Sequence, residues 1–143
     1  ANLIVPLGTP VRDVVKFCGG LKPGSREIIM GGPMMGRPIA SLDVPILKGC
    51  SGVLVFTDEQ TARQKEYHCI KCGRCLEACP YFLNPSRLAR LSKSRMFDEM
   101  KAFHVFDCVE CGCCTFACPS HIPIVQLIRS AKDDLTHRKE PDA

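Results

Sequence analysis

The chain has 143 residues, a formal charge of +4 at neutral pH and eleven cysteines. This length allows one ordinary domain or two small ones, and a small domain buries too little apolar surface to be robust without disulfides or bound metal. An odd number of cysteines and no signal peptide argue against a secreted disulfide scaffold, and a longest apolar run of only residues 52–56 argues against a membrane span. We therefore expect a soluble or peripheral protein from a reducing compartment.

The first 57 residues alternate short apolar runs with glycine- and proline-rich turns. A strand is predicted at 2–7, and Thr9 is then a good N-cap for a helix that ends before two glycines. Further strands are predicted at 26–30, 44–48 and 53–57. Because the helix has one apolar face that needs a sheet to cover it, we expect a small mixed domain over this part of the chain.

Residues 31–36 form a loop of sequence Gly-Gly-Pro-Met-Met-Gly. Glycine permits unusual backbone angles, and methionine offers a soft, adaptable surface. Two interpretations are open. The loop either contacts a cofactor or a partner subunit, or it is a tight connection whose methionines fill a core.

Two blocks of four cysteines dominate the second half, and each has the spacing C-x2-C-x2-C-x3-C-P. The blocks are Cys69, Cys72, Cys75 and Cys79 before Pro80, and Cys108, Cys111, Cys114 and Cys118 before Pro119. This is the bacterial pattern for cubane iron-sulfur clusters, because two-residue gaps let three thiolates reach three iron corners of one cube. The pattern therefore predicts two [4Fe-4S] clusters.

The fourth cysteine of each block is expected to bind the other cluster, since the proline after it breaks the local structure. The first cluster is thus assigned to Cys69, Cys72, Cys75 and Cys118, and the second to Cys108, Cys111, Cys114 and Cys79. Zinc or a redox dithiol is the weaker interpretation, because two complete blocks closed by proline are typical of clusters. An alternative in which Cys113 binds the second cluster in place of Cys114 stays open. Cys18 and Cys50 are expected to be buried free cysteines.

Helices are expected around the clusters. A linker helix is predicted over 58–68, where charged residues occur without glycine, and two helices fit between the cysteine blocks, one capped by Asn84 and one over 97–104. After the second block, Ser120 or His121 is predicted to cap a last helix whose apolar face covers the cluster core.

Charge gives little indication of a partner. Arg87, Arg90, Lys93 and Arg95 form a basic run that is either a solvated face or a docking patch for an acidic electron carrier such as ferredoxin. Each bound cluster with its thiolates would add about −2 and bring the chain near neutrality, so no nucleic-acid partner is predicted. We assign no catalytic residue, because no nucleophile with an adjacent base, P-loop or dinucleotide motif is present. The predicted chemistry is one-electron transfer.

Several motifs together resemble the C subunit of the Rnf electron-transport complex. They are Pro6-Leu7-Gly8-Thr9-Pro10, residues 29–36 around the methionine loop, the two cysteine blocks, and the run Cys118-Pro-Ser-His-Ile-Pro. The resemblance covers residues 3–132. The methionine loop and the last run carry its specificity, because the cysteine blocks alone occur in many ferredoxins.

The resemblance implies an α+β protein: a small, partial soluble-ligand-binding β-grasp domain over 1–57, the linker, and an α-helical ferredoxin-like domain over 69–143 with two [4Fe-4S] clusters. The resemblance also implies that the chain is the electron-transfer portion of the C subunit of a membrane-bound ferredoxin:NAD oxidoreductase, which moves sodium ions or protons. Such a subunit is peripheral, on the cytoplasmic face of the plasma membrane, and its partners are the other Rnf subunits, including the membrane subunits and the ferredoxin-like subunit. FMN and NAD(H) are expected only in an N-terminal region missing from this chain, which starts at Ala1 and is interpreted as a fragment.

Two alternatives from other classes remain. One is a fragment of a cobalamin-reductase-like iron-sulfur flavoprotein, whose second cysteine block would be expected to depart from this compact spacing. The other is a stand-alone ferredoxin-like carrier or sensor, and a sensor would be expected to carry a DNA-binding element, which is not visible.

Overall fold

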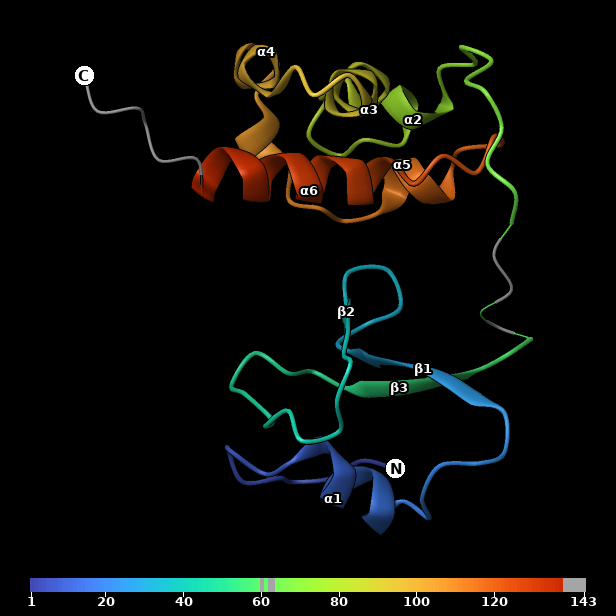
Figure 1. Cartoon of the computed structure of the whole chain (residues 1–143), viewed down its shortest axis with the longest axis vertical. Coiled ribbons are helices and arrows are strands. Elements are labelled where there is room, and N and C mark those ends of the chain that lie inside the picture. Colours follow the sequence, from blue (N-terminus) through green and yellow to red (C-terminus); the bar gives the residue numbers. More distant parts are fainter. Residues whose placement is uncertain (60, 62–63, 138–143) are drawn as a thin grey trace. The chain divides into compact units, whose positions relative to one another are not determined.

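The computed structural model describes residues 1–59, 61 and 64–137 (Figure 1). The chain divides into two compact units, Ala1–Arg63 and Gln64–Ala143, each with an apolar core of its own. It combines helices with one small three-stranded sheet. Within the described residues, no helix has the length and apolar character that a bilayer span requires.

The first unit is a three-stranded antiparallel sheet packed against one helix. Its elements are α1 (Val11–Phe17), β1 (Ser25–Met30), β2 (Arg37–Pro38) and β3 (Val53–Thr57), with β1 in the centre of the sheet. Val11 and Val15 of α1 are buried with Ile46, and Met30 and Val53 of the sheet pack against them. The strands expected at 26–30 and 53–57 are therefore present, and α1 ends at two glycines of positive φ as expected.

The loop between β1 and β2 is a tight turn formed by residues 31–36. Gly31 has φ of 111°, and a Cβ added to Gly36 would lie 2.4 Å from both the Gly32 carbonyl oxygen and the Ile29 side chain. Met34 and Met35 are about half exposed, at 45% and 54%. The tight connection is thus present, but its methionines lie at the surface and do not fill a core.

Two predicted strands of the first unit are absent. Residues 2–7 and 44–48 are all described, and neither range contains a strand. Backbone hydrogen bonds instead join residues 8–12 to residues 42–46 around one isolated bridge between Pro10 and Pro45. Proline lacks the N–H that a ladder needs, so the two residues of the bridge donate no hydrogen bond to each other. Thr9 is also not the cap of α1, because its hydroxyl donates a hydrogen bond back to a carbonyl oxygen three residues earlier.

The second unit is helical. Its elements are α2 (Arg74–Glu77), α3 (Pro85–Lys93), α4 (Phe97–Ala102), the 3-10 turn η1 (Val105–Asp107), α5 (Cys113–Phe116) and α6 (Ile124–His137). Leu88 of α3, Met100 of α4 and Ile128 of α6 are at most 1% exposed and belong to one core. Asn84 caps α3 as predicted, because its side chain accepts a hydrogen bond from the backbone N–H of Arg87 at 3.0 Å. Ile124, Ile128 and Ala131 form the buried face of α6.

The linker helix predicted over 58–68 is not found among the described residues of that range, which lie in turns or extended chain. Tertiary hydrogen bonds replace those of a helix there. The Tyr67 N–H donates to the Ser120 carbonyl oxygen, and the Ser120 hydroxyl donates to the His68 carbonyl oxygen, both at 2.9 Å. Ser120 therefore holds the entry to the first cysteine block and does not cap α6.

Candidate iron-sulfur centres

The two cysteine blocks adopt the same backbone conformation. Lys71 and Glu110 have φ of 57° and 58°, and Gly73 and Gly112, each directly before a short helix, have φ of 81° and 83°. The left-handed region is costly for lysine and glutamate, by roughly 1–3 kcal/mol each, and such strain is concentrated at functional sites. The two loops are therefore built on one plan.

The repeat extends through the short helices and the turns after them. The N–H of Ala78 donates to the Arg74 carbonyl oxygen at 3.0 Å, and the N–H of Ala117 donates to the Cys113 carbonyl oxygen at 2.9 Å. Helices α2 and α5 contact each other. Two equivalent loops are thus joined through two equivalent helices, which lie next to each other in the second unit (Figure 1).

Cys75 and three further thiols form the first group. Burial raises the pKa of the Cys75 thiol, and nearby thiols raise it further, namely those of Cys118, Cys69 and Cys72. Cys75 is buried, whereas Cys69 and Cys72 are exposed. Cys118 belongs to the second block in sequence, so the fold brings the last cysteine of one block to the first three of the other.

The second group lines a hollow that is partly open to solvent. Four of the lining residues are cysteines: Cys79, Cys108, Cys111 and Cys114. Burial raises the pKa of Cys114 to about 11 and also raises the pKa of Cys108. Cys79 comes from the first block, so the exchange of the fourth cysteine is reciprocal.

The remaining cysteines lie outside these groups. Cys114 is buried and lines the hollow, whereas Cys113 is hydrogen-bonded to Cys111 and is not among the lining residues. Cys50 donates a hydrogen bond to the Gly52 carbonyl oxygen at 3.4 Å and is half-buried. Cys18 is exposed, so the expectation that it is buried is wrong. It is the C-cap residue of the seven-residue helix α1, where residues 16–20 are all exposed.

The donor set fits iron-sulfur clusters. Thiolates are the ligands that select iron-sulfur clusters and zinc, and eight of them fall into two groups of four beside apolar walls. Among the residues that the structure describes, no three or more Cys, His, Asp or Glu side chains are arranged to hold a single metal ion. Binding would require deprotonation of thiols whose pKa is raised, so uptake of a cluster would release protons.

Sequence reasoning missed two polar connections of the second loop. The Thr115 hydroxyl accepts a hydrogen bond from the Val125 N–H at 2.9 Å. It is also hydrogen-bonded to the Cys114 thiol, and this bond lowers the pKa of the thiol, although burial raises that pKa by more. Arg129 and Lys132 of α6 bind the Glu110 carboxylate. Helical periodicity places both cations off the apolar face of α6, but nothing in the sequence indicates which carboxylate they meet.

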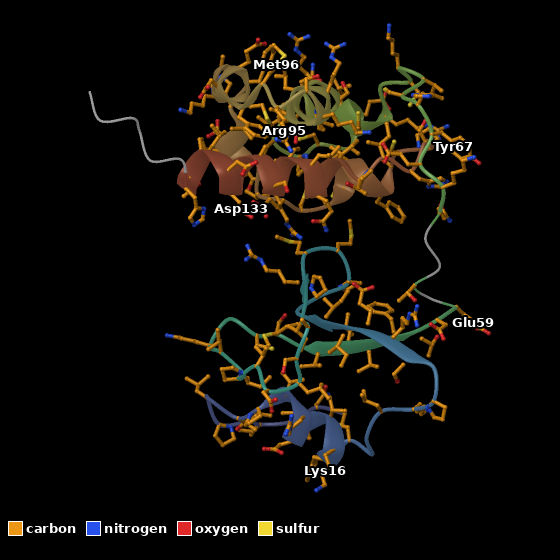
Figure 2. The ribbon with its side chains drawn as sticks, viewed as in Figure 1. Lys16, Glu59, Tyr67, Arg95, Met96 and Asp133 are labelled. Atoms are coloured by element: carbon orange, nitrogen blue, oxygen red, sulfur yellow. The ribbon has the colours of Figure 1, made fainter. Side chains whose placement is uncertain are left out.

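The basic run on α3 is partly used inside the unit. Arg87 lies over the Phe103 ring, with 5.2 Å from the guanidinium carbon to the ring centroid, and Lys93 forms an ion pair with Glu66. Arg95 begins the turn into α4, and Tyr67 lies on the segment leading into the first loop (Figure 2). The His68 carbonyl oxygen accepts a hydrogen bond from the Ser120 hydroxyl, and the residue is exposed.

Two family models match the chain. Residues 65–122 match the 4Fe-4S dicluster domain, and residues 1–38 match the SLBB domain. The dicluster match includes both cysteine blocks and ends just before α6.

Curated relatives carry related names. The chain is 50% identical over 134 residues to the C subunit of the proton-translocating ferredoxin:NAD(+) oxidoreductase complex of Clostridium ljungdahlii, covering 93% of this chain and 29% of that protein. It is 44% identical over 140 residues to the C subunit of the ion-translocating oxidoreductase complex of Rhodobacter capsulatus, covering 97% and 27%. For the corresponding C subunit of Methanosarcina acetivorans, the identity is 38% over 138 residues, covering 96% and 31%.

The chain therefore spans less than a third of the length of these relatives. Over that span, the resemblance to the C subunit of Rnf-type ion-translocating oxidoreductase complexes is confirmed.

Proposed function

We propose that this chain is the electron-transfer portion of the C subunit of an ion-translocating ferredoxin:NAD oxidoreductase, and that it passes single electrons between two [4Fe-4S] clusters. The observation that carries the proposal is that Cys118 lies near the first three cysteines of the first block and Cys79 lines the hollow with those of the second, which supports an exchange of the fourth ligand. This exchange is the ligation that two-cluster ferredoxins use. A zinc site would not need it, because four ligands of one block would suffice.

The chain's own residues would hold and insulate the clusters. The first would be bound by Cys69, Cys72, Cys75 and Cys118, and the second by Cys108, Cys111, Cys114 and Cys79. A bound [4Fe-4S] cluster supplies a one-electron carrier whose potential depends on hydrogen bonds and exposure. Leu88 and Ile128 form apolar walls that would limit water at the second site, whereas exposed Cys69 and Cys72 leave the first site nearer to solvent. The first site is thus the better candidate for electron exchange with a partner.

The wider setting follows from the relatives. We infer that the first unit is an incomplete soluble-ligand-binding β-grasp domain, which the SLBB match over residues 1–38 and the small sheet support. The partners would be the other subunits of the complex, including its ferredoxin-like subunit, and the location would be peripheral, on the cytoplasmic face of the membrane. FMN and NAD(H) sites are expected in the parts of the relatives that this chain does not span, and no residue here is assigned to them.

Electron uptake tests the proposal. The chain, reconstituted anaerobically with iron and sulfide, is mixed with chemically reduced ferredoxin, and the bleaching of its visible absorbance is followed. We expect about two electrons to be accepted per chain, one for each cluster. A control variant, Cys111→Ala, should accept about one electron fewer, because it lacks a ligand of one cluster only. A reconstituted chain that accepts no electrons would refute the proposed function.

A further inference from the structure

Three charged side chains lie together beneath the second cysteine loop. Lys132 of α6 donates from Nζ to the Glu110 carboxylate at 2.8 Å and to the Cys108 carbonyl oxygen at 2.9 Å. Arg129, one turn earlier on α6, donates from Nε to the other Glu110 oxygen at 2.7 Å. The three side chains are only 15% to 20% exposed. We call Glu110, Arg129 and Lys132 the α6 clamp.

The first cysteine loop has a different electrostatic environment. Lys71 occupies the position equivalent to Glu110 with nearly the same φ, but it is exposed and forms no ion pair within the described part of the chain. Exposed charges interact weakly because water and salt screen them, whereas half-buried charges act through a lower effective dielectric constant. The two loops therefore share a backbone plan and differ in the charge that acts on them.

The α6 clamp carries one net positive charge beside a ligand loop. Two cations face one carboxylate, and Lys132 also reaches the backbone of Cys108 itself. A nearby positive charge favours the more negative of two states of a bound group, and reduction adds one negative charge to a cluster.

We propose that Lys132 is a positioning residue that fixes the second cysteine loop on α6 and raises the reduction potential of the cluster bound there, while Glu110 moderates that effect. The inference rests on the proposed two-cluster function and adds a means by which one chain gives its two clusters different potentials. Truncation of Lys132 would leave Glu110 with Arg129 as its only partner in the clamp. Neutralisation of Glu110 would instead remove the one negative charge of the α6 clamp.

The test is an EPR-monitored redox titration of the reconstituted chain that resolves two midpoint potentials. Lys132→Met is expected to lower one midpoint and to leave the other unchanged. Glu110→Gln keeps the shape of the side chain without its charge, and it is expected to raise that same midpoint. Lys132→Arg keeps the charge and should stay close to the wild type. A purely structural role would not shift one potential in opposite directions.

Lys101→Met is the control, because it also removes one positive charge but from an exposed side chain of α4, where Lys101 forms an ion pair with Asp98. The inference would be overturned if Lys132→Met and Glu110→Gln shifted the midpoint potential in the same direction, or if neither variant shifted it. An equal shift of the midpoint in Lys101→Met would also overturn it. If Lys132→Met loses four irons and with them one cluster, Glu110→Gln alone tests the inference. A raised midpoint potential then supports the inference, and a lowered or unchanged one overturns it. A wild-type chain without two clusters would instead overturn the proposed function, and iron counting distinguishes that failure from the others.

Discussion

Leu88 joins the helical core to the second cysteine group, so its truncation tests the packing directly. The residue is 0% exposed on α3 and also lines the hollow that holds Cys79 and Cys114. Leu88→Ala removes apolar groups worth about 0.8 kcal/mol for each CH₂, and a residual cavity adds to the loss, so comparable truncations cost roughly 2–5 kcal/mol. Because part of the side chain faces the hollow, we expect a loss of about 3 kcal/mol in the free energy of unfolding.

The assay is anaerobic urea unfolding of the reconstituted chain, followed by circular dichroism of the helices. With a slope of about 1–3 kcal/mol per molar urea, the midpoint should fall by roughly 1–3 M. Leu76→Ala is the matched control, because Leu76 is 40% exposed on α2 and its truncation should cost less than about 0.5 kcal/mol. If both variants lowered the midpoint equally, the described core would be wrong.

Three other changes test the site and the first unit. Thr115→Val removes the hydrogen bond to the first turn of α6 and should cost about 1 kcal/mol, or roughly 4–8 °C in melting temperature. Thr115→Ser keeps the hydroxyl, and an equal loss in it would contradict this role. Gly36→Ala places a methyl group 2.4 Å from the backbone of its own loop and should destabilise the sheet by about 1–3 kcal/mol, seen as faster amide exchange in β1; unchanged exchange would argue against the tight turn. Cys79→Ala should give a reduced EPR spectrum like that of Cys111→Ala, and a spectrum like that of Cys72→Ala would refute the exchanged ligation.

Local signals predicted most of the helical unit. Asn84 before proline predicted the start of α3, and the side chain caps the helix in the structure. The apolar spacing predicted α6, whose buried residues include Ile124 and Ile128. These signals succeed because capping and helical periodicity involve residues within a few positions of one another.

Signals that depend on distant partners failed. The apolar run at 2–7 has strand composition, but it forms no strand, and the hydrogen bonds to residues 42–46 come from residues 8–12 instead. The charged run at 58–68 suits a helix, yet hydrogen bonds to Ser120 hold its end in extended chain. In both cases the tertiary environment overrides local propensity.

For the cysteine groups too, local spacing was informative and contacts with distant residues were not. Spacing within each block predicts two cluster sites, and the proline after each fourth cysteine predicts the exchange of Cys79 and Cys118. This ligation stays a prediction, which the position of Cys118 near the first group and of Cys79 in the hollow of the second supports. Cys114 could be chosen over Cys113 only by comparison of the blocks, and the structure buries Cys114 beside the hollow. The pairing of Glu110 with Arg129 and Lys132 was beyond prediction, because it depends on where α6 crosses the loop.

The most direct test of the two-cluster assignment is chemical analysis with low-temperature EPR. The chain is reconstituted anaerobically, its iron and acid-labile sulfide are counted, and the dithionite-reduced form is measured. We predict about eight irons and eight sulfides per chain with the spin-coupled signals of two nearby reduced clusters. Bound zinc, or about one iron per chain without sulfide, would contradict the assignment and leave the cysteine groups with a structural role.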